Sequence, residues 1–269
     1  MNKIEIIDTH CHIHEADYPN AEQVIKQGKA AGITKFICVG TDLQSSKRAV
    51  EFAKKYKSYG AFAAVGIHPH EATAEKIELN LSLADSTWAE LEVLASQPEV
   101  VAIGEFGFDF FYHKEAEARA NQTKLAQKHL QLATKLNLPL ILHIREAFQP
   151  FLEIIKDYPK LKGVIHSFSD TPAKLNSVLS LPNNFYIGLN GIMTFSKSPP
   201  QLESAKLVPL KRLVLETDAP YLTPTPLRGK INTISNTRII AEFLSDLRRE
   251  DLEHFCKTTT KNAKLLFHI

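Results

Sequence analysis

Short apolar runs alternate with longer helical patterns along the whole chain. The runs expected to form strands are residues 3–8, 35–40, 61–66, 100–104, 139–143, 162–166, 184–189 and 212–216. The helical patterns lie at residues 20–31, 44–57, 82–95, 115–136, 147–156, 172–180, 201–206 and 235–247. Because right-handed crossovers return each strand parallel to the one before it, this alternation predicts a (β/α)8 barrel. We therefore expect an α/β fold, a TIM barrel that occupies residues 1–269 as a single domain.

Composition is compatible with such a barrel and narrows the class of protein. A chain of 269 residues with 44% hydrophobic content can bury a large core. Thirty-two basic and thirty acidic residues leave a net charge of +2, so overall charge predicts neither nucleic-acid nor membrane binding. A polyanionic substrate would need a local basic patch.

The cysteines and the lack of long apolar segments indicate the cellular compartment of the protein. The three cysteines, Cys11, Cys38 and Cys256, are an odd number without paired metal-finger spacing, which suits a reducing compartment. The segment Met1–Ile6 lacks the long apolar core of a secretory signal, and no run approaches the length of a membrane span. We therefore expect a soluble, cytoplasmic protein, and no obligate protein partner can be read from the sequence.

Metal-binding residue types recur where the expected strands end. They are His10, His12, Glu105, His143, His166 and Asp218. In a closed parallel barrel the carboxyl ends of all strands lie on one face, so these groups would converge on one site. A doubly wound sheet, the alternative fold, has edges too far apart to do this readily. The pattern favours a metal-dependent hydrolase.

The spacing of the histidines supports a shared ion. His10 and His12 are two apart on an extended segment and can bind one ion from the same face, whereas Cys11 should point away. His14 continues the spacing beyond the expected end of the strand and is a weaker ligand candidate. The alternative for any one histidine is a hydrogen-bonded core residue, and recurrence at one strand level argues against it.

The carboxylates have separate expected roles. Glu105 lies among small residues and could bridge two ions; its alternative is a salt bridge to Arg145 or Lys230. Asp218 could both contact a metal and take a proton from water. Glu216 is expected either outside the barrel mouth or in support of a ligand.

Seven motifs occur in order over essentially the whole chain. They are Asp8–His12, Val65–His70, Gly104–Asp109, Leu138–Arg145, His166–Ser169, Glu216–Pro224 and Arg228–Asn232. Together they resemble the TatD-related deoxyribonuclease family, a branch of the amidohydrolase-like metal-dependent hydrolases. The resemblance implies a barrel whose one- or two-metal site is formed by the six residues named above. It also implies phosphodiester hydrolysis, typically 3′-to-5′ trimming of DNA and sometimes RNA ends.

The chain departs from the family pattern at a few positions. The family often has Asp where this chain has His14 and Glu146, and Pro where it has Thr233-Ile234-Ser235. None of these changes removes an expected ligand, so they bear on substrate preference. From their places in the matched motifs, His70 and Arg228 are expected to contact phosphate or substrate, the alternative being a structural hydrogen bond in a loop.

The expected mechanism uses one or two divalent ions bridged by Glu105. Such ions lower the pKa of a bound water and polarise a phosphoryl oxygen, while Asp218 accepts the proton. Imidazole ligands favour Zn²⁺ or Mn²⁺, whereas Mg²⁺ prefers oxygen and is kept as a candidate by the family resemblance. The expected substrate is an end of single-stranded DNA, with RNA as a second candidate.

Three other functions remain open at this stage. The same site could hydrolyse a C–N or ester bond, including an aminoacyl ester on tRNA. A polymerase-and-histidinol-phosphatase-like phosphoesterase would explain the spacing of His10, His12 and His14, but eight strands with Asp218 on the last argue against it. An inactive, metal-containing nucleic-acid-binding module is disfavoured because every expected ligand is present.

Overall fold

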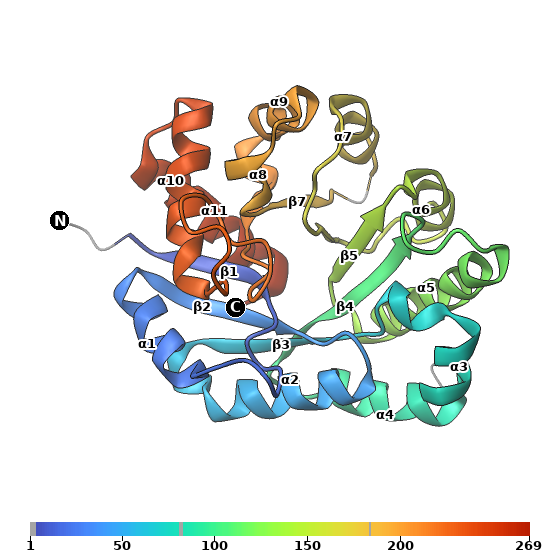
Figure 1. Ribbon diagram of the computed structural model, residues 1–269. Helices are drawn as coiled ribbons and strands as arrows, with labels where there is room; N and C mark the ends of the chain where they lie inside the picture. Colours follow the sequence, from blue (N-terminus) through green and yellow to red (C-terminus); the bar gives the residue numbers. More distant parts are fainter. Residues whose placement is uncertain (1–3, 81–82, 183) are drawn as a thin grey trace.

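The computed structural model describes residues 4–80, 83–182 and 184–269. One parallel sheet runs in the order β1 to β8, with helices around its outside (Figure 1). The strands are β1 Ile6–Cys11, β2 Ile33–Val39, β3 Ala61–Val65, β4 Val100–Asp109, β5 Leu140–Arg145, β6 Gly163–Ile165, β7 Tyr186–Leu189 and β8 Leu213–Leu215. The helices are α1 Ala21–Ala30, α2 Leu43–Lys55, α3 Ala74–Asn80, α4 Asp85–Ala95, α5 Ala116–Leu136, α6 Phe148–Ile155, α7 Pro172–Leu179, α8 Ile192–Phe195, α9 Pro199–Leu207, α10 Thr237–Arg248 and α11 Leu252–Phe267. The predicted (β/α)8 barrel is confirmed.

The first and last strands meet along what we call the β1–β8 seam, formed by Asp8, His10, Thr217 and Asp218. The backbone N–H of Asp218 donates to the carbonyl of His10 over 2.9 Å. The buried carboxylate of Asp8 accepts from the N–H and the hydroxyl of Thr217, at 3.0 and 2.6 Å. Two ligand candidates, His10 and Asp218, are therefore fixed against each other by backbone contacts.

Two apolar cores support the barrel. The interior is filled by Ile7, Ile37, Val39, Ala64, Val101, Ala102, Ile141, Val164 and Val214. Ala263, Leu266 and Phe267 of α11 pack into the same cluster and close one end of the barrel. A larger core lies between the strands and the surrounding helices. Alternate strand residues face the two cores, as a closed sheet with helices outside requires.

A bulge in β1 turns its histidines inward. Ile7 packs inside the barrel and Cys11 in the outer core, although residues four apart in a regular strand share a face. The pairing register with β2 shifts between Asp8 and Cys11, which accounts for the change of face. His10 and His12 consequently point into the barrel mouth, and Cys11 points away, with its sulfur 3.4 Å from a carbonyl oxygen of β2.

The observed boundaries differ from the expected ones mainly at two strands that carry ligands. The strand expected at 3–8 runs over Ile6–Cys11, with residue 3 outside the described part of the chain, and that expected at 100–104 continues to Asp109. The helix expected at 82–95 begins at Asp85, and residue 82 likewise lies outside the described residues. Within the described ranges, no helix is both long and apolar enough to cross a lipid bilayer.

Helix α11 is absent from the sequence-based expectations, as are the short helices α3 and α8. The run Thr258-Thr259-Thr260 has low helix propensity and obscures the apolar pattern of α11. Tertiary contacts stabilise the helix instead. The Thr260 hydroxyl donates to the carbonyl of Glu5 over 2.8 Å, and the Asn262 amide donates to the carbonyl of Leu213 over 2.7 Å.

Candidate metal centre

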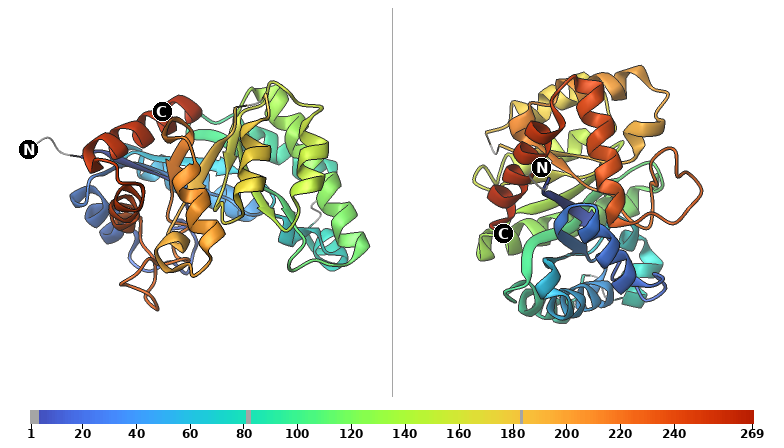
Figure 2. Two further views of the ribbon diagram at one scale, coloured as in Figure 1. Left: turned by 90° about the horizontal axis from the view of Figure 1, so that it is seen from above. Right: turned by 90° about the vertical axis from the view of Figure 1, so that its left-hand side faces the viewer.

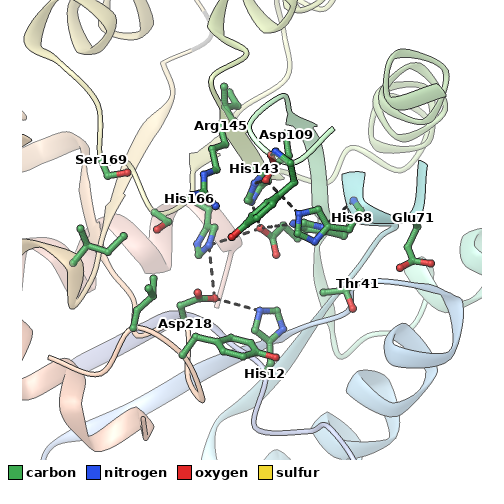
Figure 3. Close-up of a pocket in the computed structure, with 18 of the residues that line it drawn as sticks. His12, Thr41, His68, Glu71, Asp109, His143, Arg145, His166, Ser169 and Asp218 are labelled. Carbon is green, nitrogen blue, oxygen red and sulfur yellow. Dashed lines mark hydrogen bonds and ion pairs between the residues drawn. The ribbon is translucent and has the colours of Figure 1, made fainter. Parts of the chain in front are cut away.

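The six predicted ligands lie together on five strands or just beyond them, five of them near carboxyl ends and Glu105 in the middle of the long strand β4. They are His10, His12, Glu105, His143, His166 and Asp218. Five of the six line a cavity of about 680 Å³, and the sixth, His10, is fully buried with its Nε2 atom 3.1 Å from that of His12. Figure 3 shows His12 and His166 joined by dashed lines to Asp218, and His143 beside Asp109. A cavity of this volume is typical of a small-ligand site.

The first cluster consists of His10, His12 and Asp218. The Nε2 atoms of the two histidines are 3.1 Å apart, and Oδ1 of Asp218 lies 3.6 and 3.3 Å from them. Donor atoms about 2.1 Å from a tetrahedral ion are about 3.4 Å from one another. The observed spacing therefore suits one divalent ion. Oε2 of Glu105, 3.4 Å from Nε2 of His10, supplies a fourth donor.

Glu105 reaches a second cluster through its other oxygen. Oε1 lies 2.8 Å from Nδ1 of His143 and 3.8 Å from Nε2 of His166. Nε2 of His68 is 3.5 Å from the same oxygen. One carboxylate thus faces nitrogen donors on both sides, which is the arrangement that a bridge between two ions needs.

The backbone around Glu105 explains why small residues flank it. Gly104 and Gly107 have φ angles of 151° and 145°, a region that disfavours side chains, and a Cβ on either would collide with β5. Within the described residues the ion pairs of Glu105 are all with histidines, so the alternative pairing with Arg145 or Lys230 is not observed.

Burial and the surrounding imidazoles shift the pKa values of Glu105 and Asp218 in opposite directions. Burial alone raises the pKa of Glu105, but the imidazoles of His68 and His166 hold it well below its ordinary value. Burial also raises the pKa of Asp218, and the hydrogen bond from His12 together with the charge of His166 lowers it on balance. Both carboxylates are therefore ionised at neutral pH, as metal ligands must be.

Two ligand candidates, His12 and His166, are oriented by the partners of their Nδ1 atoms. Nδ1 of His12 donates to the carbonyl of Val39 over 2.8 Å, which leaves Nε2 with a lone pair for an ion. Oε1 of Glu216 lies 3.0 Å from Nδ1 of His166 and accepts from the N–H of Ser167 over 2.6 Å. Burial lowers the pKa of His166, but the charge of Glu216 and of Glu105 raises it to about 10. Glu216 thus takes the supporting position.

Asp109 lies behind His143 in the same way. Its Oδ2 is 3.1 Å from Nε2 of His143 and 3.3 Å from Nε2 of His70, and its Oδ1 accepts from the N–H of Tyr112 over 2.9 Å. Burial raises the pKa of this carboxyl, and the hydrogen bonds from His143 and His70 bring it below its ordinary value. His70, a predicted substrate contact, also lines the cavity.

Two residues that were considered as a substrate contact and as a ligand, Arg228 and His14, lie outside the cavity. The exposed guanidinium of Arg228 is 3.8 Å from the centre of the Phe195 ring and donates to the carbonyl of Thr223 over 2.8 Å. Among the residues that the structure describes, the cavity lining does not include Arg228. Nε2 of His14 lies 3.2 Å from both Ser45 and Glu15. The structure therefore brings His70 to the centre and leaves Arg228 and His14 away from it.

His68 was not predicted as a ligand, and no role was predicted for Asp109. Both had a readable signal. His68 follows the end of β3 by three residues, much as other ligand candidates follow their strands. Asp109 is four residues beyond Glu105 and shares its strand face through Gly107. Two cations, Lys76 and Arg145, also line the cavity and carry no expected substrate role.

Comparisons with known proteins agree over almost the full length of the chain. The family model described as TatD related DNase matches residues 7–268. In Bacillus subtilis (strain 168), YabD, described as an uncharacterized metal-dependent hydrolase, is 33% identical over 267 residues, which cover 98% of this chain and 99% of that protein.

Two further relatives have more specific descriptions. The 3′-5′ ssDNA/RNA exonuclease TatD of Erwinia tasmaniensis is 34% identical over 258 residues, covering 92% of this chain and 93% of that protein. The crystal structure of YJJV, a TatD homolog from Escherichia coli K12, has a TM-score of 0.87 and 27% identity, and the match covers 99% of both chains.

Proposed function

The chain belongs to the TatD-related DNase family of metal-dependent hydrolases, and from that premise we propose that it removes nucleotides stepwise from the 3′ end of single-stranded DNA, with RNA as a second substrate. The observation that carries the proposal is Glu105, whose two oxygens face separate groups of nitrogen donors at the bottom of one cavity. Two-ion sites of this kind are used for phosphodiester hydrolysis.

The ligand assignment follows the two clusters. His10, His12, Glu105 and Asp218 would hold one ion, and Glu105, His143 and His166 would hold the other, with His68 within reach of the second. When bound, divalent ions activate water and polarise a phosphoryl oxygen. The mixed imidazole and carboxylate donors suit Zn²⁺ or Mn²⁺ best and admit Mg²⁺.

Asp218 is the proton acceptor in this proposal. It lines the cavity and its pKa lies below the ordinary value, so its carboxylate is unprotonated when substrate arrives. The backbone of Asp218 is in the left-handed region, with a φ angle of 60°. This conformation is uncommon for residues other than glycine and concentrates at functional sites. A carboxylate so held can take a proton from the attacking water and return it to the leaving oxygen.

Substrate binding relies on a few local charges. Lys76, Arg145 and His70 line the cavity and can contact phosphate oxygens. A net charge of +2 offers little attraction along a long duplex. A recessed centre is also more accessible to a flexible single-stranded end than to an internal bond of a rigid helix. Arg228 remains a predicted contact that would require the loop after β8 to turn toward the substrate.

The direct test uses a 5′-labelled linear single strand, the same sequence as a closed circle, and purified protein supplied with Zn²⁺, Mn²⁺ or Mg²⁺. We expect a ladder of products shortened one nucleotide at a time from the 3′ end, and an intact circle. Asp218→Asn purified in parallel controls for contaminating nuclease. Cleavage of the circle as fast as the linear strand would contradict exonuclease action.

The same preparations distinguish the alternatives. Aminoacyl-tRNA and a cyclic amide are incubated with each metal alongside the oligonucleotides. Release of the amino acid or opening of the ring, with no loss of oligonucleotide, would assign the site to ester or amide hydrolysis. Tight binding of oligonucleotide without turnover under any metal would assign it to an inactive binding module.

A further inference from the structure

Exposed aromatic side chains gather on two loops at the barrel mouth. Of the seven large apolar side chains that are exposed in the described residues, four lie on the β4–α5 and β8–α10 loops: Phe111, Tyr112, Tyr221 and Ile231. Tyr112 is 58% exposed and Tyr221 62%, and both line the cavity. The β8–α10 loop, in orange-red, projects from the body in both views of Figure 2. Such a concentration of exposed rings marks a binding surface.

The two tyrosines come from opposite sides of the barrel mouth. Strands β4 and β8 are four positions apart in the eight-stranded order, so they stand on opposite sides of the closed barrel. Tyr112 follows β4 and Tyr221 follows β8. Both line the cavity, so a ligand bound there can contact Tyr112 from one side and Tyr221 from the other.

Tyr112 is held rigidly against residues of the centre. Its N–H donates to Asp109 over 2.9 Å, and its ring lies edge-on to the His70 ring, with centroids 5.4 Å apart. The Arg145 guanidinium lies 4.8 Å from the centre of the Tyr112 ring and 4.0 Å from that of Phe111. This stack fixes the ring and brings a positive charge beside it.

Tyr221 is attached to the opposite side of the centre. Its N–H donates to the carbonyl of Asp218 over 2.8 Å, and its own carbonyl accepts from the amide of Asn232 over 2.5 Å. Its ring lies edge-on to His12, with centroids 6.2 Å apart. The backbone N–H of each tyrosine is thus bonded to an aspartate of the site, that of Tyr112 to the carboxylate of Asp109 and that of Tyr221 to the backbone carbonyl of Asp218.

We propose that Tyr112 and Tyr221 stack on the two nucleobases that flank the scissile phosphodiester, one base on each side of the metal centre. This inference rests on the proposed exonuclease function and specifies how that substrate is held. Flat rings that stay exposed beside a cavity lined by metal-ligand candidates and by Arg145 match a nucleotide better than an aliphatic or peptide ligand. Because every base has a π-face, stacking tolerates any sequence while requiring that a base be present.

The test compares single strands that differ only by the loss of one base. Four 5′-labelled oligonucleotides are used: one complete, and three with a stable tetrahydrofuran abasic unit at the 3′-terminal, the penultimate or a distant internal position. The number of phosphates is the same in all four. We expect kcat/KM for the first cleavage to fall on the order of tenfold for the terminal and penultimate abasic units, and to stay unchanged for the distant one.

Variants then assign the effect to the rings. Tyr112→Ala and Tyr221→Ala should each raise KM for the complete strand and lose discrimination against one of the two abasic positions. Tyr112→Phe and Tyr221→Phe keep the ring and should keep that discrimination. Leu265→Ala, also an exposed apolar side chain but on α11, is the matched surface control and should behave as wild type.

The outcomes separate this inference from the function on which it rests. If the wild type cleaves complete and abasic strands equally, the stacking inference is wrong and the exonuclease function stands. Loss of discrimination in the phenylalanine variants would mean that the hydroxyls act instead of the rings, which also overturns it. If the wild type cleaves no oligonucleotide with any metal, the exonuclease proposal itself fails and this inference fails with it.

Discussion

The carboxylate of Asp109 lies 3.1 Å from one nitrogen of the His143 ring, while the other nitrogen lies 2.8 Å from Glu105. A ring held at both nitrogens has a single orientation. When Nε2 donates its proton to Asp109, Nδ1 keeps a lone pair and points it at the position expected for an ion. Asp109 is therefore a positioning residue whose effect reaches the metal through His143.

Asp109→Ala should weaken metal binding at the second position, because His143 loses both its tautomer and its orientation. Carboxylates behind metal-bound histidines typically contribute 10- to 100-fold in affinity. The measurement is competition between the protein and a chromophoric chelator, with the exposed Asp157→Ala as control. Metal affinity equal to that of the wild type would show that His143 needs no partner.

Asp218→Asn and Glu105→Ala should separate proton transfer from metal binding. The asparagine keeps one oxygen able to coordinate but removes the basic one, so metal content should largely persist while kcat falls on the order of 10²–10⁴. Glu105→Ala removes the whole bridge, so its main defect should be metal content. Elemental analysis and kcat are measured on both after thermal melts confirm folding. Wild-type kcat in fully loaded Asp218→Asn would exclude Asp218 as the base.

Removal of metal should lower the melting temperature as well as abolish activity. An ion that binds only the folded state stabilises it by about 2.7 kcal/mol when its concentration is 100 times Kd. Chelator-treated protein should therefore melt at lower temperature and recover on addition of Zn²⁺, Mn²⁺ or Mg²⁺. Glu105→Ala should show a much smaller recovery. Full activity in protein shown to be metal-free would sink the proposed mechanism.

Glu15 predicts a specific dependence of stability on pH. Burial alone raises the pKa of Glu15, but hydrogen bonds from His14 and Ser45, and then from Arg48, lower it far below its ordinary 4.5. A depressed pKa stabilises the fold above the unfolded-state value, so the contribution is complete above pH 4.5 and is lost as pH falls toward the folded-state value.

Glu15→Gln should therefore lower the free energy of unfolding by about 1 kcal/mol at pH 7. The difference from wild type should shrink below pH 4.5. Urea denaturation of chelator-treated protein at several pH values measures it without interference from metal release. Glu51→Gln, which alters an exposed pair with Lys54, is the matched control. A constant difference between pH 7 and pH 3 would contradict the pKa assignment.

The sequence predicts the ligand positions that depend on spacing along one strand. It does not predict the contacts that depend on how neighbouring strands pair. His10, His12 and Glu105 could be read from the ends of apolar runs. The position of Asp109 on the same strand face as Glu105 was readable, but its contact with His143 depends on the register of β4 against β5, which shifts between Ile103 and Phe106. Helix α11 was hidden for a related reason, since its threonines are stabilised by distant partners.

Substrate contacts were the least predictable part of the site. His70 follows a strand closely, and its position at the cavity matches the expectation from the motif. Arg228 belongs to a long loop whose path is fixed by local contacts, such as the Phe195 ring, that no strand periodicity encodes. The same holds for Tyr112 and Tyr221, which line one cavity only because the fold brings the loops after β4 and β8 to the same end of the barrel.

The β1–β8 seam gives the enzyme a built-in delay during its own synthesis. Asp8 and Thr217 are 209 residues apart, and the metal position beside them needs both ends of the chain. Ribosomes add about 5–20 residues per second, so the histidines of the first strand wait roughly 10–40 s before Asp218 is made. A nascent chain therefore lacks a complete first metal position until the residues that follow β8 have been made.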